Sequence, residues 1–162
     1  MSTRSVIHDT FTIQRRYPVP ASKVFAAFAS AEAKNVWGDT GNLEPAEGAA
    51  GVAEFDFRPG GSERFGFKMD GTTYRYDAQY YDIVPDRRIV YAYQMYADDR
   101  RISVSVSTVD LSVSGDDTML TYTEQGAYLD GFDGSQAPSL RREGTTEMLD
   151  NLTGYLASEM AG

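Results

Sequence analysis

The sequence predicts an α+β fold in which a curved antiparallel sheet of about seven strands wraps around one long C-terminal helix. The 162 residues have the length of one ordinary domain, so we assign residues 1–162 to a single domain. Most of the chain alternates apolar and polar residues, and its 11 Tyr and 8 Phe are of types that favour strands. The C-terminal segment instead repeats apolar residues at helical spacing.

The N-terminal part is predicted to form one strand and two short helices. Residues 4–17 alternate, with Phe11 on the apolar face and His8 on the opposite face. Residues 21–28 carry apolar side chains at the spacing of a one-sided helix, and a second short helix is expected at 31–37. The Gly, Ala and Glu-rich stretch that follows is expected to be a loop.

Six further strands are predicted from apolar alternation and from the turn signals between them. Turns such as Asp70-Gly71 and Pro85-Asp86 are short, and short turns join strands that pair antiparallel. The predicted strands cover residues 52–58, 64–69, 72–84, 88–96, 101–113 and 118–125.

Two of these strands change the face on which their apolar residues lie. Val104 and Val106 share one face, whereas Val109 takes the other, and a similar change falls at Tyr80–Tyr81. A slip of one residue within a strand is the effect of a β-bulge, and bulges bend long sheets. We therefore expect bulges at Ser107–Thr108 and at Tyr80–Tyr81, and a strongly curved sheet.

The last helix is predicted from about residue 138 to residue 160. Gly144 and Gly154 lie within it and each costs about 1 kcal/mol of stability relative to Ala. We interpret at least one of them as a point where the helix closely approaches the sheet. The apolar stripe that would face the sheet comprises Met148, Leu149, Leu152, Leu156 and Met160.

Composition and charge exclude several classes of function. The net charge of −9 opposes binding to nucleic acid and to anionic membrane surfaces. No apolar run approaches the ~20 residues needed to cross a bilayer, and the N-terminus lacks the apolar region of a secretory signal, so we expect a cytoplasmic protein. The absence of Cys excludes thiolate nucleophiles and Cys-bound metals, and the single histidine, His8, excludes two-His metal sites. We expect neither a metal nor a cofactor.

Five segments resemble one known family. They are Val19–Phe28, Asn35–Gly38, Phe55–Gly61, Ile83–Tyr91 and Thr118–Glu124. They resemble the N-terminal helix, the tryptophan turn, the strand-turn signature, the central hairpin and the last strand of the SRPBCC (START/Bet v-like) superfamily, in the group named after the activator of heat-shock-protein-90 ATPase. The resemblance implies the helix-grip fold. It does not select a function, because this scaffold hosts lipid carriers, polyketide cyclases, stress proteins and co-chaperone domains.

Two local features bear on the shape of the interior. Family members often carry a Gly-Trp pair early in the last helix, whereas this chain has Gly144-Thr145. The smaller side chain implies an enlarged cavity beside it. The Gly-rich loop at residues 125–134 is interpreted either as a flexible lid over the cavity mouth or as an ordinary surface connection.

Tyrosine and phenylalanine side chains on one face of the predicted sheet suggest the function. Packing against the helix also explains the Phe residues, but buried Tyr hydroxyls need partners, so several of them together indicate a pocket that contains water or a polar ligand. We predict a cavity between sheet and helix that binds a small hydrophobic or aromatic molecule. The predicted ligand-binding residues are Trp37, Phe55, Phe57, Phe67, Tyr76, Tyr91, Tyr93, Tyr122, Thr145, Met148 and Leu152.

Two other functions stay open from the sequence. A cofactor-independent cyclase- or hydratase-like enzyme would need a buried titratable residue, such as Glu124 or Arg58, that points into the cavity without a structural partner. Arg58 is more simply explained by pairing with Asp56 or Glu54. A co-chaperone-like interaction module would need a chaperone partner, which no sequence feature supplies. A homodimer through exposed strands of the sheet also stays open.

Overall fold

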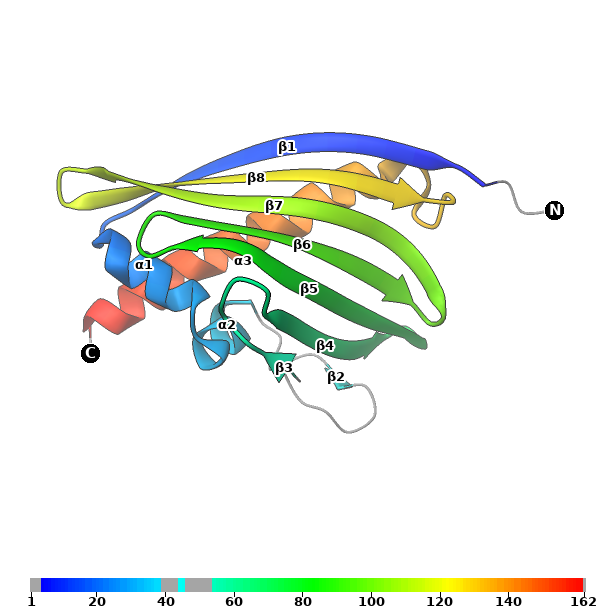
Figure 1. Cartoon of the computed structure of the whole chain (residues 1–162), viewed down its shortest axis with the longest axis horizontal. Coiled ribbons are helices and arrows are strands. Elements are labelled where there is room, and N and C mark those ends of the chain that lie inside the picture. Colours follow the sequence, from blue (N-terminus) through cyan, green and yellow to red (C-terminus); the bar gives the residue numbers. More distant parts are fainter. Residues whose placement is uncertain (1–3, 39–43, 46–53, 162) are drawn as a thin grey trace.

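In the computed structural model, which describes residues 4–38, 44–45 and 54–161, the strands form one antiparallel sheet that curves around the last helix (Figure 1). This confirms the predicted fold class. The elements are β1 (Val6–Tyr17), α1 (Ala21–Phe28), α2 (Ala31–Trp37), β2 (Glu44–Pro45), β3 (Glu54–Phe55), β4 (Ser62–Met69), β5 (Thr72–Val84), β6 (Arg88–Ala97), β7 (Arg100–Ser114), β8 (Asp117–Leu129), a short 3-10 helix (Gly134–Gln136) and α3 (Ala137–Ala161).

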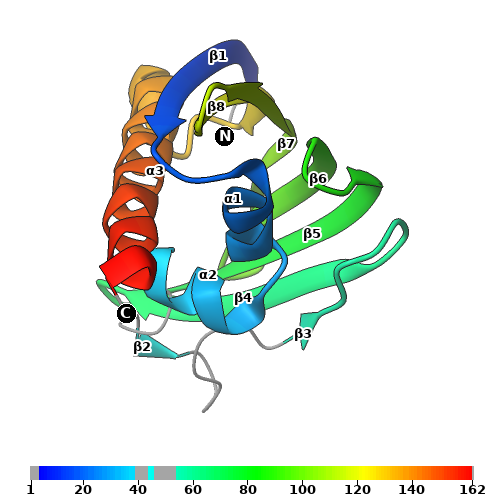
Figure 2. The ribbon, with the colours of Figure 1, turned by 90° about the vertical axis from the view of Figure 1, so that its left-hand side faces the viewer.

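The sheet has the order β1-β8-β7-β6-β5-β4-β2, and β3 also pairs with β4. Strands β4 to β8 each pair with the next strand in the chain. The first strand, β1, forms the edge of the sheet opposite β2 and pairs along its whole length with β8. Seen along the long axis of the molecule, the sheet forms a trough that α3 covers, and α1 and α2 lie at one end of this trough (Figure 2). None of the described helices is long and apolar enough to cross a membrane.

The edge beyond β4 departs from the prediction. The predicted strand at 52–58 is reduced to the two residues of β3, and its first two residues lie outside the described part of the chain. A tight turn follows this strand. It brings Gly61 so close to the backbone of Asp56 that a Cβ atom at residue 61 would lie 2.0 Å from the Asp56 carbonyl oxygen. The short strand β2 lies in the stretch predicted as a loop and pairs with β4.

One of the two predicted bulges is confirmed. The pairing of β5 with β6 shifts between Tyr80 and Asp82, so Tyr81 is the extra residue. Tyr80 before the bulge is buried in the core, and Ile83 beyond it, which has the opposite parity, also packs against the core, so the inward face changes parity at Tyr81.

The bulge predicted at Ser107–Thr108 is wrong. The pairing of β7 is regular there and shifts instead opposite Met95 and Tyr96, where Ile102 is the extra residue. Beyond this point the serines at 103, 105 and 107 face inward, whereas Val104 and Val106 are 40% and 41% exposed. The valines were expected to face inward, but polar partners inside the fold, described below, hold the serines there.

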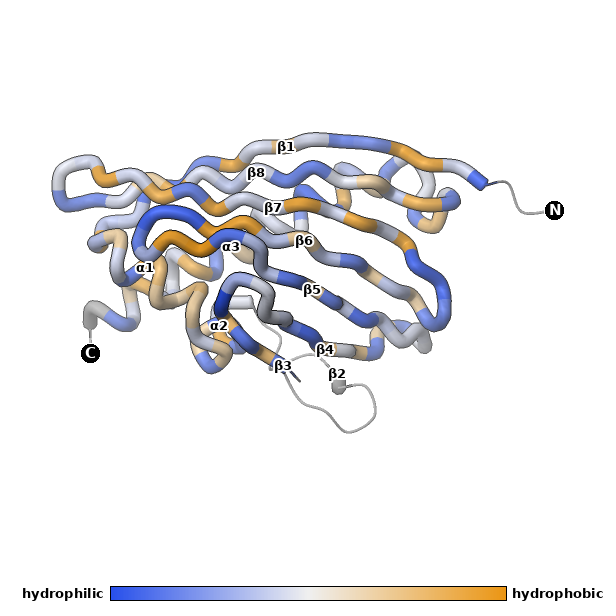
Figure 3. The backbone as a smooth tube through the Cα atoms, viewed as in Figure 1, coloured by the Kyte–Doolittle hydropathy of each residue, from blue (hydrophilic) through white to orange (hydrophobic). Residues whose placement is uncertain are grey.

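The second half of α3 packs on a conventional core. Leu149, Leu152 and Leu156 are at most 3% exposed, and the Tyr17 hydroxyl donates to the carbonyl oxygen of Leu149 at 3.0 Å. Burial of each such side chain contributes about 1.5–3 kcal/mol. The apolar segments of β5 and β6 also gather at the end of the sheet beside α1 (Figure 3). The side chain of Met160, assigned to the same stripe, lies outside the described residues.

The interpretation of the α3 glycines as points of close approach is wrong. Gly144 and Gly154 are both exposed, and a Cβ atom added at either would meet nothing within 4 Å. Neither glycine is therefore required by contact with the sheet.

Candidate ligand-binding site

A cavity of about 340 Å³, here called the interior chamber, lies between the first half of α3 and the inner face of the sheet. Trp37 reaches it from the end of α2, where its indole Nε1 donates to the carbonyl oxygen of Ala27 at 2.9 Å. The predicted ligand-binding residues that line it are Trp37, Phe67, Tyr76, Tyr91, Tyr93, Tyr122, Thr145 and Met148.

Three predicted residues do not line the interior chamber. Phe55 and Phe57 stack on each other with ring centres 6.0 Å apart, and both pack against Tyr80. Phe57 also packs edge-on against Phe25 of α1, so this pair belongs to the core beside the short helices. Leu152 is fully buried in the packed half of α3.

Aromatic rings form one wall of the interior chamber. Phe65 and Tyr76 face each other across β4 and β5 with ring centres 4.9 Å apart, and Tyr76 is followed on β6 by Tyr93 at 5.0 Å. Such rows of rings in offset contact are favourable beyond the area that they bury. They give the chamber a largely apolar, aromatic wall.

A buried carboxylate, Glu124, organises the polar part of the sheet below α3. Its side chain is fully buried and accepts hydrogen bonds from Tyr93 at 2.8 and 2.9 Å and from Tyr122 at 3.0 Å. The Ser107 hydroxyl donates to it at 3.0 Å, which explains why this serine faces inward. Because a buried charge is costly without partners, this set of bonds is what allows an acid inside the fold.

Arg141 supplies the matching cation from α3. Its Nη1 donates to the Tyr93 hydroxyl at 2.8 Å and lies 3.5 Å from Glu124, while Nη2 donates to Ser103 at 2.8 Å. Burial acts to lower the pKa of Arg141, but the neighbouring Tyr93 and Glu124 outweigh it and raise the pKa overall. The guanidinium therefore stays charged.

The inward tyrosines stay protonated at neutral pH. Burial, followed by the nearby carboxylates and other tyrosines, raises the pKa of Tyr93 and Tyr122 well above the ordinary value. Burial also raises the pKa of Tyr91, whose hydroxyl lies 3.1 Å from that of Tyr122. These side chains can donate and accept hydrogen bonds but do not supply a negative charge.

A second ion pair lies at the α2 side of the interior chamber. Lys34 Nζ lies 2.6 Å from Glu63, which is 2% exposed and also accepts from the Tyr80 hydroxyl. Both charged residues line the chamber. Each cation at the chamber is thus paired with a buried acid, Lys34 with Glu63 and Arg141 with Glu124.

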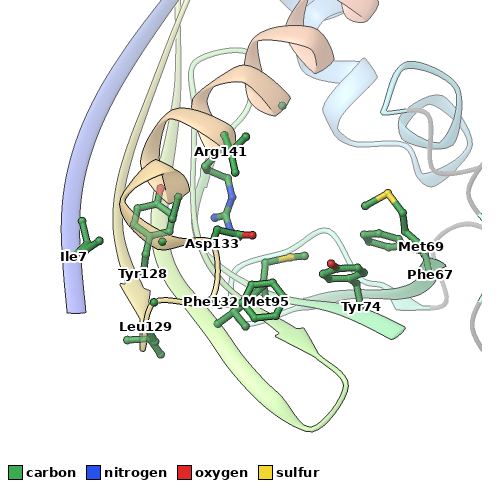
Figure 4. Close-up of a pocket in the computed structure, with 16 residues that line it drawn as sticks. Ile7, Phe67, Met69, Tyr74, Met95, Tyr128, Leu129, Phe132, Asp133 and Arg141 are labelled. Atoms are coloured by element: carbon green, nitrogen blue, oxygen red, sulfur yellow. The ribbon is translucent and has the colours of Figure 1, made fainter. Parts of the chain in front are cut away.

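A second cavity of about 400 Å³, here called the mouth chamber, adjoins the first below the start of α3 (Figure 4). Leu129 at the end of β8, and Phe132 and Asp133 in the loop that follows it, contribute to its lining. This loop is attached to the body of the protein, because Arg100 Nη2 donates to the carbonyl oxygen of Asp130 at 2.6 Å. The residues that line both chambers are Phe67, Met95, Leu140, Arg141 and Gly144.

Comparison with known proteins assigns the family. The model of the family described as "Activator of Hsp90 ATPase homolog 1-like protein" matches residues 18–157. The chain belongs to this family. This confirms the SRPBCC-type resemblance seen in the sequence. No curated protein gives a significant match.

Solved structures show how far the family resemblance extends. The Mll3558 protein from Rhizobium loti is 45% identical, with a TM-score of 0.82 over 93% of this chain and 99% of that one. A putative uncharacterized protein from Rhizobium leguminosarum is 37% identical, with a TM-score of 0.81 over 97% and 99%. DynU16, a putative protein of the dynemicin biosynthetic locus, is 18% identical, with a TM-score of 0.63 over 93% and 48%, and shows the shared fold alone.

Sequence reasoning missed several chamber residues for which a signal was present. On β4, Glu63 has the same parity as Phe65. On β8, Glu124, which the sequence did offer as a candidate buried acid, has the same parity as Tyr122. An acid on the apolar face of a strand is a recognisable sign of a buried polar site. Arg141 lies one helical turn before Thr145. The residues that line the interior chamber but were absent from the predicted set are Phe28, Lys34, Gly38, Glu63, Phe65, Met95, Leu140, Arg141 and Gly144.

Proposed function

We propose that the protein binds a small, flat and mainly apolar organic molecule in the interior chamber. The chamber itself is the observation that carries this proposal, since its volume of about 340 Å³ lies within the range of small-molecule sites, about 300–1,000 Å³. The aromatic wall formed by Tyr76 and its neighbours Phe65 and Tyr93 suits contact with an aromatic compound. The predicted residues that line the chamber are the proposed contacts.

The charges around the chamber favour a ligand without net charge. Lys34 is paired with Glu63 and Arg141 with Glu124, so neither cation is left to neutralise an anion. A charged ligand would lose its hydration without gaining a matching charge. A neutral aromatic molecule loses far less on entry.

The sole tryptophan makes the proposal directly testable. Trp37 lines the chamber, so a bound naphthalene should quench its fluorescence. We would titrate the protein with N,N-dimethyl-naphthylamine, a neutral fused-ring probe. Saturable quenching with one probe per chain is expected, and absence of quenching at the solubility limit of the probe would sink the proposal.

A matched pair of threonine variants locates the bound probe. Thr145 is 6% exposed and lines the chamber, whereas Thr153 is exposed on the same helix. Thr145→Phe fills the space and should weaken probe binding by at least about 10-fold, a cost of about 1.4 kcal/mol. Thr153→Phe should leave the affinity unchanged. Equal effects of the two variants would place the probe elsewhere.

The enzyme alternative receives less support than binding. Glu124 is buried but fully engaged with Tyr93, Tyr122 and Ser107, and Arg58 is exposed and pairs with Asp56 at 2.8 Å. Neither residue is thus a buried titratable group without a structural partner. Conversion of the probe or of a discovered ligand, seen by mass spectrometry, would reverse this ranking.

The chaperone alternative and the homodimer stay predictions. The family takes its description from an activator of the Hsp90 ATPase, and a stoichiometric complex with that chaperone in size-exclusion chromatography would favour an interaction module. The same chromatogram would show whether the chain alone forms a dimer.

A further inference from the structure

The hydroxyl of Tyr128 is buried in the wall of the mouth chamber without a hydrogen-bond partner among the described residues. Tyr128 is 5% exposed and belongs to the inward face of β8. Burial raises the pKa of Tyr128 to about 12, so the hydroxyl is protonated at neutral pH and able to donate. Because almost all buried hydroxyls in native proteins are paired, this one calls for a partner from outside the protein.

The absence of a side chain at Gly126 leaves space for the Tyr128 hydroxyl. A Cβ atom at Gly126 would lie 3.0 Å from the Tyr128 hydroxyl and 3.1 Å from the hydroxyl of Ser105. The tyrosine hydroxyl therefore lies over residue 126, close to the serine that Arg141 Nη1 contacts at 3.4 Å.

Arg141 stands beside Tyr128 at the junction of the two chambers. Its guanidinium carbon lies 5.4 Å from the centre of the Tyr128 ring. Figure 4 shows it descending from α3 between Tyr128 on one side and Phe67, Met95 and Tyr74 on the other. Its hydrogen bonds to the sheet use Nη1 and Nη2, and no bond from Nε is found among the described residues. The Tyr128 hydroxyl and the Arg141 guanidinium, both hydrogen-bond donors, thus belong to neighbouring side chains at this junction.

The charges at this junction disfavour an anionic partner. Arg141 is the cation, but Glu124 lies 3.5 Å from it and Asp133 also lines the mouth chamber. Burial raises the pKa of Tyr128 most, Arg141 acts to lower it, and Glu124 and then Asp9 on the neighbouring strand raise it further. The acceptor that suits these donors is therefore an uncharged oxygen.

We propose that the ligand carries a neutral carbonyl oxygen, as in an aromatic ketone or quinone, that accepts hydrogen bonds from Tyr128 and Arg141. Its ring system lies in the interior chamber, and the carbonyl lies at the junction with the mouth chamber. This inference rests on the proposed function and adds the chemical class of the ligand.

Three probes with the same ring system separate the two proposals. Prodan is a dimethylamino-naphthalene with a ketone, N,N-dimethyl-naphthylamine lacks the carbonyl, and dimethylamino-naphthoic acid carries a carboxylate instead. The hydrogen bonds to its carbonyl should make Prodan bind at least about 5-fold tighter than the naphthylamine. The acid should bind more weakly than Prodan. Prodan emission also moves to longer wavelength when its carbonyl accepts a hydrogen bond, which gives a second readout.

Tyr128→Phe removes the hydroxyl without breaking a hydrogen bond seen in the protein. It should keep the thermal midpoint unchanged or raise it, weaken Prodan about 5-fold and shift its bound emission to shorter wavelength. Binding of the naphthylamine should not change. Tyr81→Phe, on the exposed face of β5, is the control and should behave as the wild type with all three probes.

Each remaining outcome rejects a defined claim. Unchanged Prodan affinity and emission in Tyr128→Phe would overturn the carbonyl inference, while naphthylamine binding blocked by Thr145→Phe would leave the proposed function intact. Tighter binding of the acid than of Prodan would overturn the neutral acceptor. Failure of all three probes to bind the wild type would reject the proposed function and this inference with it.

Discussion

The two halves of α3 lie over one sheet but meet opposite kinds of surface. The second half presents Leu149 and Leu152, both fully buried, to a close-packed apolar core. The first half presents Arg141 and Thr145 to a cavity. A helix of 25 residues thus serves as a core element at one end and as a cavity wall at the other.

The inner face of the sheet changes at the same level as the helix. On the packed side, Leu111 of β7 pairs with Leu120 of β8, and both side chains are buried. On the side of the interior chamber, here called the hollow end, Ser107 of β7 pairs with Glu124 of β8. The strands β7 and β8 and the helix α3 thus change together from large apolar to small or polar side chains. All three elements therefore contribute to the hollow end, and this end of the protein gains less free energy from the burial of apolar side chains than the packed end does.

Truncation of one leucine in each half should give the largest contrast. Leu152→Ala should lower the free energy of unfolding by about 3–5 kcal/mol, because it leaves a cavity in packed surroundings. Leu140→Ala should cost about 1 kcal/mol or less, since Leu140 is 46% exposed and borders existing space. Urea unfolding of the two variants measures both values, and similar losses would break the comparison.

Removal of the hollow-end cation should be costly for a different reason. Arg141→Met leaves the fully buried Glu124 without its cation and should lower the free energy of unfolding by about 3 kcal/mol. Arg142→Met, at the exposed neighbouring position, should stay within about 0.5 kcal/mol of the wild type. If the two variants were equally stable, the ion pair would not support the hollow end.

Alkaline pH should destabilise the protein through its buried tyrosines. Burial raises the pKa of Tyr91, Tyr93 and Tyr122 in the folded state above the ordinary value near 10. Above about pH 10 the unfolded chain loses these protons while the folded chain keeps them. The contribution of these tyrosines to the free energy of unfolding is therefore fully present below that pH and is lost as the pH rises. Each such tyrosine contributes a slope of about 1.4 kcal/mol per pH unit.

A single variant tests this origin of the pH dependence. Tyr91→Phe should reduce the slope of unfolding free energy against pH between about pH 10 and 11 by one tyrosine's share, whereas Tyr81→Phe should not. Urea midpoints measured across this interval provide the slopes. A wild-type stability that is flat up to pH 11 would contradict the assignment.

The two exposed glycines of α3 should show the smallest effect and the same sign. Gly144→Ala and Gly154→Ala each add a methyl group to open space and improve helix propensity, so each should raise the free energy of unfolding by about 1 kcal/mol. Thermal unfolding monitored by circular dichroism compares them. Loss of stability in Gly144→Ala alone would restore the interpretation of close contact at the hollow end.

The packed end was accessible to sequence reasoning, whereas the hollow end was accessible only in part. Alternation and helical spacing predict where Phe11 and Leu152 lie because apolar side chains have one general reason to be inside. The same rule placed Val104 and Val106 inside and was wrong, since the inward position of Ser107 depends on Glu124 of the next strand. Arg141 was missed because its partners come from three strands, β6, β7 and β8, that one helical segment does not reveal.

Methyl NMR of the methionines tests the central claim, binding within the hollow end, most directly. Met95 lines both chambers and Met148 lines the interior chamber, whereas Met119 lies on the outward-facing positions of β8. During titration with Prodan, the account predicts saturable shifts of the Met95 and Met148 methyl signals and an unchanged Met119 signal. Saturable binding of Prodan without a shift of the Met95 and Met148 methyl signals would contradict it.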